Sequence, residues 1–562
     1  MLIAASIDLA CQGRSAPPSG ASTAAKRGGE LVASVRTEPR SFNRFAARDS
    51  STDLVATLTQ ARLVRINKKT QEVEPWLAES WKTSDDGRRI TLALRQNVVF
   101  SDGHPFTADD VVFTFEAAYD RRAATVLADS LEINGKRLEI AAPDPHTIVV
   151  TFPEPFAPGV RLLDNVPILP RHKLESALTA GTFARAWGLS TPPADIAGLG
   201  PFVLAEYTPG QRLVFTRNRR YWRTAADGAE LPYLDRVTVD IVSDQNAELL
   251  RLAAGQLDVT NGEIPSESYA TVKRAADGGR VRVLDLGVSN EADSFWFNLK
   301  PGAFAGDPRA SWLQDDALRR AISLTVDRLA FANTVFLGAG EPVYGPETPA
   351  NKKWYWTGTP QPAPDLAAAK KLLAGLDLAD RNGDGMLEDR HGNPARFTIL
   401  TQKGRPRLER GAAVIRDELK QVGLAVDVAA LDGNAVFERF GSGKYDAVYF
   451  HPSRTDTDPA ITPDFWFSYG TAHLWNMSQT KPATEWEAQI DALMLRQIAS
   501  PDPAERKRLF DEVQRIFIEH TPVIYFAAPR VVVAMSSRVI NATPAVTLSP
   551  LLWSPDTLAV IH

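Results

Sequence analysis

One loop of the sequence carries two carboxylates that could do chemistry. The loop runs from His451 to Pro459 and places Asp456 and Asp458 two residues apart. Asp456 could hold an amine, pair with the nearby Arg454, or cap a helix that begins near Pro459, and these interpretations stay open. A hydrolase could use the two carboxylates as acid and base only if the fold brought them together on a substrate. No nucleophile or metal motif supports that alternative.

Aromatic side chains crowd the stretch that follows this loop, including Phe465 and Tyr469. Rings with an amide nearby suit apolar or peptide-like ligands, whereas an anionic ligand would need converging arginines. Some of the 12 tryptophans must fill the core instead. The residues expected to line a binding cleft, together with Asp456 and Asp458, are Trp466, Phe467, Trp475, Asn476, Trp296 and Asn298.

A second segment has the spacing of a calcium loop. Asp380, Asn382 and Asp384 alternate as in the D-x-N-x-D-G opening, and Met386 takes the next alternating position. His391 stands at position twelve, where a bidentate Glu would complete such a site. The segment therefore predicts either a structural calcium site or a hydrophilic turn between a helix and a strand, and we favour the turn.

No other pattern in the sequence indicates catalysis. The eight histidines are scattered without HExxH spacing, and neither a GxSxG elbow nor a GxxxxGK[ST] phosphate loop is present. The glycines at 198–200 indicate a turn, because a proline and a strand follow where a phosphate cradle needs a helix N-terminus. A protein that binds without catalysing, and without a cofactor, is therefore expected.

The composition is that of a large globular protein. Its 562 residues and 61.5 kDa predict two or three domains. The 63 basic residues are outnumbered by 68 acidic ones, so the net charge of -5 gives no electrostatic drive toward nucleic acid. The single cysteine excludes an intramolecular disulfide framework.

That cysteine, Cys11, lies in a segment, residues 1–28, that is expected to be a leader and flexible linker. It follows a short apolar stretch and precedes a run rich in Gly, Ser and Pro, which resembles a lipoprotein signal peptide whose cysteine bears the lipid. Asp8 and the missing basic residues before the apolar stretch depart from that pattern. Lipid attachment at Cys11 and an incidental cysteine in a disordered start both stay open.

Alternating strands and helices are expected to position the loop at 451–459. A strand at 397–399, a helix over 408–422 that ends at Gly423, and a strand from 426 make one unit. A further strand over 445–450 places the loop after it at the carboxyl end of a parallel or mixed sheet, where ligands bind. Earlier elements are expected as a strand at 31–35, a strand at 90–94, a helix from Thr107 with a capping box to Asp110, a hairpin over 202–215 and a strand–helix–strand unit over 237–259.

Several motifs, taken in order, resemble one known family. They are PWLAESW at 75–81, DG at 86–87, LR at 94–95, FSDG at 100–103, PFTADDV at 105–111, GLGPF at 198–202, FN at 297–298 and RRAIS at 319–323. This series is similar to that of the extracellular solute-binding proteins of family 5, the dipeptide, oligopeptide and nickel-binding type that serves ABC importers. The resemblance extends from about Gly29 to the C-terminus.

The resemblance implies an α/β, periplasmic-binding-protein-like fold of type II, a two-lobed clamp with a hinge. Lobe I would be a sheet domain built from residues 29–65, 198–288 and 527–562. An inserted domain would cover residues 66–197, and lobe II, an α/β domain, would cover residues 289–526.

It also implies a monomeric receptor in the periplasm or at the cell surface that delivers a peptide or other small solute to ABC permease subunits. An oligosaccharide, a metal chelate, haem or an opine could replace the peptide on the same scaffold. A sensory role, with ligand presented to a receptor kinase or chemoreceptor, stays open as well.

The resemblance also bears on ligand anchoring. In peptide binders of the family, an aspartate four residues before a proline pairs with the α-ammonium of the ligand. That position is Thr455 here, and Asp456 follows one residue later. Asp456 is therefore the nearest candidate anchor in a loop that departs from the pattern.

Overall fold

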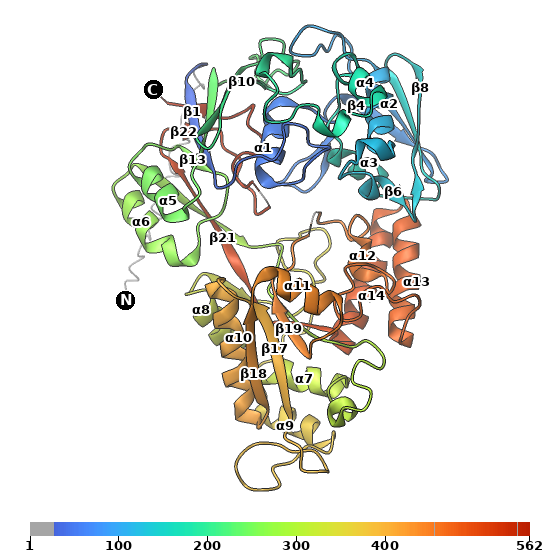
Figure 1. Cartoon of the computed structure of the whole chain (residues 1–562), viewed down its shortest axis with the longest axis vertical. Helices are drawn as coiled ribbons and strands as arrows, with labels where there is room; N and C mark the ends of the chain where they lie inside the picture. The colour runs from blue at the N-terminus through green and yellow to red at the C-terminus, as the bar shows by residue number, and fades with distance from the viewer. Residues whose placement is uncertain (1–26, 455, 548, 562) are drawn as a thin grey trace, which may run out of the picture.

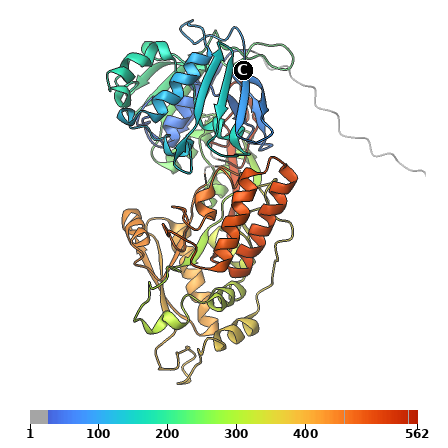
Figure 2. The same cartoon turned by 90° about the vertical axis from the view of Figure 1, so that its right-hand side faces the viewer.

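The computed structural model describes residues 27–454, 456–547 and 549–561, so Cys11 and Thr455 lie outside the described residues. The chain forms two bodies stacked along the long axis of the molecule (Figure 1). Lobe I and the inserted domain make the upper body, and lobe II makes the lower one. The view from the side places the C-terminal helices directly beneath the sheet of the inserted domain (Figure 2).

Lobe I is built on a mixed eight-stranded sheet of order β10-β11-β12-β1-β13-β21-β14, with β16 paired to β21. The strand predicted at 31–35 is confirmed as β1, and its Leu31, Ala33 and Val35 side chains are buried. The strands that lobe I contributes are β1 (Glu30–Val35), β10 (Phe202–Thr208), β11 (Arg212–Arg217), β12 (Arg236–Ile241), β13 (Val259–Thr260), β14 (Val281–Val288) and β21 (Ala527–Ser536), and lobe II contributes β16 (Gly340–Pro342). The helices and the small paired strands of this lobe are α1 (Ser50–Thr59), α5 (Gln245–Ala253), α6 (Tyr269–Asp277), β22 (Val539–Ile540) and β23 (Ala559–Val560).

The inserted domain has an antiparallel four-stranded sheet of order β4-β5-β9-β8. The capping box is confirmed, since Thr107 and Asp110 satisfy each other's backbone at the start of α2. The expected boundary between residues 65 and 66 falls inside a strand, β2, which pairs with β3. The elements are β2 (Val64–Ile66), β3 (Val73–Pro75), β4 (Ala78–Thr83), β5 (Arg89–Leu94), β6 (Glu132–Ile133), β7 (Lys136–Arg137), β8 (Glu139–Asp144), β9 (Thr147–Thr151), α2 (Ala108–Tyr119), α3 (Gly159–Leu162) and α4 (Arg171–Thr179).

Lobe II has a five-stranded mixed sheet of order β18-β17-β19-β15-β20. The predicted parallel unit is confirmed, with β17 parallel to both β18 and β19, and Gly423 ends the helical stretch after α10 at φ 81. The strands are β15 (Ser294–Phe297), β17 (Arg396–Gln402), β18 (Ala425–Leu431), β19 (Ala447–Phe450) and β20 (Val523–Tyr525). The helices are α7 (Asp316–Thr325), α8 (Arg328–Val335), α9 (Leu366–Ala374), α10 (Pro406–Leu419), α11 (Gly433–Gly441), α12 (Pro463–Trp466), α13 (Glu485–Ala499) and α14 (Pro503–His520).

The chain crosses between the two bodies at two neighbouring places. It leaves lobe I after β14 and enters lobe II at β15, and it returns from β20 into β21. The first residues of β21 pair with β16, which precedes α9 in lobe II, and its later residues pair with β14. One ten-residue strand therefore belongs to both bodies, and Figure 1 shows it running from one to the other. Two adjacent crossings form the geometry of a hinge.

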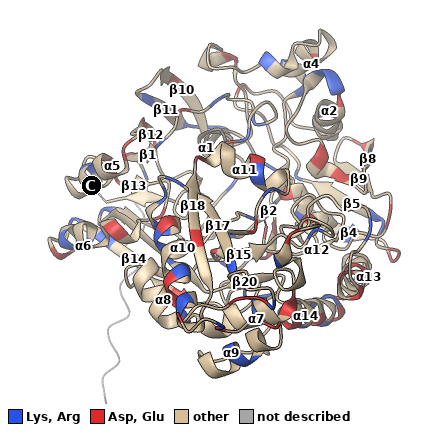
Figure 3. Cartoon of the chain, turned by 60° about the horizontal axis from the view of Figure 1, so that its bottom comes forward, with Lys and Arg blue, Asp and Glu red and all other residues tan. Residues whose placement is uncertain are grey.

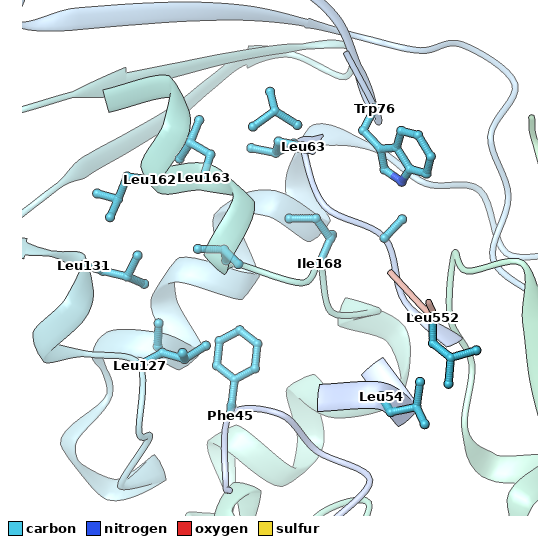
Figure 4. Close-up of a cluster of buried hydrophobic side chains, with 14 of the residues drawn as sticks. Phe45, Leu54, Leu63, Trp76, Leu127, Leu131, Leu162, Leu163, Ile168 and Leu552 are labelled. Carbon is cyan, nitrogen blue, oxygen red and sulfur yellow. The ribbon is translucent and has the colours of Figure 1, made fainter. Parts of the chain in front are cut away.

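The inserted domain and lobe I share a continuous hydrophobic core. Leu54 of α1 and Leu552 near the C-terminus lie in one cluster with Leu127, Leu131 and Ile168 of the inserted domain (Figure 4). Apolar burial at about 25 cal/mol per Å² makes separation of these parts costly. The inserted domain and lobe I are therefore expected to move together.

The outer surface carries charges of both signs. Figure 3 shows basic and acidic positions intermixed on the helices of lobe II. On α14, for example, Arg508 pairs with Glu505, and Arg515 pairs with Glu512 and Glu519. Within the described part of the chain, no helix is both long and apolar enough to cross a membrane.

Candidate functional site

A cavity of about 890 Å³ lies between the inserted domain and lobe II. Residues within 126–135 and 154–162 form its upper wall. Residues within 290–294, 452–454 and 460–474 form most of the lower wall. Backbone contact at one end closes the two bodies on each other, since the Ala157 amide donates to the Ile498 carbonyl at 2.8 Å. The volume falls in the range of sites for small ligands.

The loop after β19 reaches this interface as its position at a strand end predicted. Its carboxylate Asp456 accepts a hydrogen bond from Arg161 of α3, with Nε 2.7 Å from Oδ1. Arg161 also donates to the Gln71 carbonyl at 2.7 Å and to the Thr457 hydroxyl at 3.0 Å. Burial raises the pKa of Asp456 and the charge of Arg161 opposes that rise. Asp456 is thus held by a guanidinium from the other body.

Asp458 is held by a different arginine. Its carboxylate takes two hydrogen bonds from Arg506 of α14, at 2.7 and 3.1 Å, and also accepts from the Ala460 amide. Both charged side chains are buried. Such a pair fixes the loop against α14 and leaves Asp458 outside the lining of the cavity.

Among the expected aromatic residues, Phe467 lines the cavity, whereas Trp466, Trp475 and Trp296 do not. Trp466 packs in the core against Phe510 and Phe517 of α14. The Trp475 indole donates to Glu487 at 3.1 Å and is buried behind the wall. The aromatic cluster therefore divides into rings that build the wall and rings that face the cavity.

Three further expected residues are placed in supporting positions. Trp296 is buried on β15, and Asn298 donates to the Gly443 carbonyl at 2.8 Å. Asn476 donates to Gln479 at 2.6 Å. None of the three is among the residues that line the cavity.

Arg454 lines the cavity. The sequence indicated it only as a possible partner of Asp456. Its guanidinium instead pairs with the buried Glu347 and donates to the Pro346 carbonyl at 2.9 Å. Its backbone amide donates to Glu291 at 2.6 Å. These contacts join the loop after β19 to the segment after the hinge, and no local sequence signal could have paired residues so far apart.

A buried polar network lies beside the hinge. Asp293 accepts from the Tyr449 hydroxyl at 2.9 Å, lies 2.9 Å from His451 Nδ1, and pairs with Arg407 at 3.1 Å. Burial alone would lower the pKa of His451, but the carboxylates of Asp293 and Glu291 outweigh it and raise that pKa to about 9. The imidazole is therefore charged at neutral pH.

The segment with calcium-loop spacing folds as a compact turn in lobe II. The carboxylate oxygens of Asp380, Asp384 and Glu388 lie within 4.8 Å of one another. Each carboxylate also accepts backbone amides of the turn, with Asp380 taking those of Gly383 and Gly385 at 2.7 and 3.0 Å. Glu388, which the sequence reading left out, joins this group, while Asn382 donates to Glu388 at 2.6 Å. Binding of calcium by this turn stays a prediction.

Comparison with known proteins gives a consistent picture. The sequence model described as bacterial extracellular solute-binding proteins, family 5 Middle, matches residues 72–473. A probable ABC transporter-binding protein of Deinococcus radiodurans is 29% identical over 521 residues, which are 89% of this chain and 87% of that protein. The oligopeptide-binding protein AppA of Bacillus subtilis is 26% identical over 545 residues, 94% of this chain and 91% of that protein.

The fold is likewise that of solved binding proteins. The ABC transporter substrate-binding protein CtaP of Listeria monocytogenes superimposes with a TM-score of 0.77 at 23% identity, covering 96% of this chain and 100% of that one. The predicted two-lobed α/β architecture is thereby confirmed.

Proposed function

The chain belongs to the bacterial extracellular solute-binding proteins of family 5, and on that premise we propose that it is the receptor of an ABC importer. It binds a small solute between the inserted domain and lobe II and presents it to the permease subunits in the membrane. It acts as a monomer and has no role with nucleic acid.

The cavity between the two bodies is the observation that carries this proposal. Its volume of about 890 Å³ lies between walls from two bodies that the described chain joins at two adjacent crossings. A ligand that contacts both walls favours the closed arrangement by its differential affinity for it. This is the mechanical requirement for a receptor that captures a solute and later releases it.

The same geometry supports binding without catalysis. The two carboxylates that could have served as acid and base are each held by an arginine, Asp456 by Arg161 and Asp458 by Arg506. A general base must be free to take a proton from the substrate. Their engagement supports a scaffolding role for both.

A peptide is the first candidate ligand. A cavity of this size with aromatic and polar residues in its walls suits a short peptide. One observation favours the second candidate, a non-peptide solute such as an oligosaccharide, a metal chelate, haem or an opine. The carboxylate nearest to the amine-anchoring position, Asp456, is already paired with Arg161.

The protein is proposed to work in the periplasm or at the cell surface. Lipid attachment at Cys11 would hold it near its permease, because an acyl chain adds membrane affinity of about 0.8 kcal/mol for each buried CH₂ group.

Native mass spectrometry of protein purified without denaturation tests the proposal. Receptors of this kind are expected to retain cargo, so masses matching short peptides should accompany the protein and vanish on unfolding. Masses of a sugar, chelate or haem would replace the peptide with the second candidate. Turnover of a peptide or glycoside library by the purified protein would contradict the non-catalytic role.

A further inference from the structure

One corner of the cavity combines a ring stack with carboxylates from both walls. The rings of Phe467 and Tyr469 stack at 4.9 Å between centroids and 13° between planes, and both residues line the cavity. Phe467 covers one side of the Tyr469 ring, and Tyr469 stays 45% exposed. An aromatic ring with an open face attracts a cation through its quadrupole.

Two carboxylates line the cavity near this stack. Asp464 belongs to lobe II, and Glu154 belongs to the inserted domain on the opposite wall. Burial raises the pKa of Tyr469, and the negative charges of Asp491, Glu154 and Asp464 raise it further.

Local contacts hold these acids in place without neutralising them. Glu154 accepts from the Asn134 amide, Asp464 accepts from the Thr471 hydroxyl at 2.9 Å, and Asp491 accepts from Ser468. Within the described residues, none of the three acids forms an ion pair at 4.0 Å or less with Lys, Arg or His.

A glycine allows the chain to bring Asp464 close to Tyr469. A Cβ atom at Gly470 would lie 2.0 Å from the Asp464 carbonyl oxygen, well inside van der Waals contact. The turn from α12 back to Tyr469 therefore requires glycine there. The backbone at residue 470 therefore packs directly on the backbone of Asp464.

The net charge of the whole lining is negative, like that of this corner. The acidic lining residues are Asp129, Glu132, Glu154, Glu291 and Asp464, and the basic ones are Arg48 and Arg454. Three of these charges are engaged in ion pairs: Arg454 with Glu347, Glu132 with Arg137, and Glu291 with His451. Among the described residues, this leaves Asp129, Glu154 and Asp464 against Arg48. A partly desolvated cavity with this excess of negative charge repels anionic ligands and attracts cationic ones.

From this geometry we infer that the cavity selects solutes that carry an ammonium or guanidinium group, and that this group lies on Tyr469 between Glu154 and Asp464. The inference rests on the proposed function and adds the class of solute. A cation in this position would also join the two walls, because Glu154 and Asp464 belong to different bodies. Binding of the charged group is thereby coupled to closure.

Isothermal titration with three matched peptides tests the inference: Ala-Ala-Ala, Ala-Lys-Ala and Ala-Glu-Ala. Ala-Lys-Ala is expected to bind at least about tenfold more tightly than Ala-Glu-Ala at low ionic strength, with the difference shrinking as salt is added. N-acetylated forms of the same peptides separate the side-chain ammonium from the α-ammonium. If the preference for Ala-Lys-Ala over Ala-Glu-Ala survives acetylation, the lysine side chain occupies the corner. If acetylation abolishes the preference, the peptide N-terminus occupies it.

Variants locate the effect within the cavity. Glu154→Gln and Asp464→Asn are each expected to reduce the preference for the lysine peptide, and Tyr469→Leu to reduce its affinity more than that of Ala-Ala-Ala. Glu139→Gln, in an exposed position of β8 outside the lining, is the matched control and should change nothing. Equal affinities for the lysine and glutamate peptides would overturn the inference and leave the receptor role standing.

If none of the peptides binds, a peptide is excluded as the cargo. A second pair of probes then tests whether the cavity selects cations. Cadaverine and glutarate have the same number of carbons and opposite charges. Binding of cadaverine that is lost in Glu154→Gln and Asp464→Asn would support a cation-selective cavity for a non-peptide solute. Binding of neither probe, or of glutarate alone, would overturn the inference.

Discussion

Arg161 and Asp456 meet across the interface between the inserted domain and lobe II, with Nε 2.7 Å from Oδ1. The side chains keep only 10% and 5% of their surface exposed. Such shielding strengthens a charge-assisted contact relative to one in water. The contact therefore stabilises the closed arrangement, because opening the interface would separate the two charges.

The first prediction concerns this contact. Arg161→Gln is expected to weaken binding of the cargo identified by mass spectrometry by about tenfold, or ~1.4 kcal/mol, because closure loses the two hydrogen bonds from this guanidinium to Asp456 and Thr457. Isothermal titration measures it. Arg171→Gln is the control, since that arginine forms an exposed pair with Glu175 in the same domain. Unchanged affinity in Arg161→Gln would show that the pair does not contribute to closure.

The second prediction concerns stability. Asp458→Ala leaves the Arg506 guanidinium buried without its partner and is expected to lower the free energy of unfolding by about 3–5 kcal/mol. Glu505→Gln, which breaks an exposed pair with Arg508 on the same helix, should cost less than about 1 kcal/mol. Urea unfolding followed by tryptophan fluorescence compares the two. Similar losses for both variants would argue against a structural role for Asp458.

The third prediction concerns pH. His451 has its pKa raised to about 9, above the ordinary value of about 6.5. Its stabilising contribution is therefore complete below about pH 6.5 and is lost as the pH rises through about 9, a change of about 3 kcal/mol. Asp293, Glu291, Glu263 and Arg407 are the charged groups that act on it or on its neighbours.

Thermal unfolding of the wild type and of His451→Gln checks this expectation. It is measured from pH 6.5 to 9, the range over which the pKa of His451 is shifted. The difference in melting temperature between the two proteins should narrow as the pH rises. A difference that stays constant across the range would mean that His451 does not titrate there.

The fourth prediction concerns the turn at 380–388. Chelation of divalent cations is expected to leave the melting temperature unchanged, because the carboxylates of this turn accept its own backbone amides. Calorimetry in EDTA and in millimolar calcium measures it. A rise of several degrees with calcium that disappears in Asp384→Asn would establish the calcium site instead.

The fifth prediction concerns Cys11. If the cysteine bears lipid, the wild-type protein fractionates with membranes and Cys11→Ser moves it to the aqueous fraction. The expected readout is immunoblotting of the two fractions from the native host. Identical distribution of both proteins would favour the incidental cysteine.

Elements with local signals were predictable from the sequence. The capping box needs only Thr107 and Asp110, three residues apart, and the helix end at Gly423 needs only one glycine that accepts a positive φ. The position of the loop after β19 followed from the order of strands and helices. Each of these features is decided within a few residues or by the pattern of elements.

The contents of the cavity were less predictable, for a physical reason. Asp456 pairs with Arg161, which comes 295 residues earlier in the chain. The sequence near either residue gives no indication of the other. Trp466 and Tyr469 are three residues apart in one aromatic run, yet the first enters the core and the second faces the cavity. An aromatic run indicates burial or binding, and only the three-dimensional fold separates the two.

The position of β21 has a consequence for the order in which the protein can fold. This strand lies between β13 and β14 in the large sheet, although it comes from residues 527–536, near the end of the chain. The ribosome therefore delivers an interior strand of the first lobe only after the whole second lobe has been made. Lobe II can fold as a contiguous segment before that point, whereas the large sheet cannot close until residues 527–536 have been made.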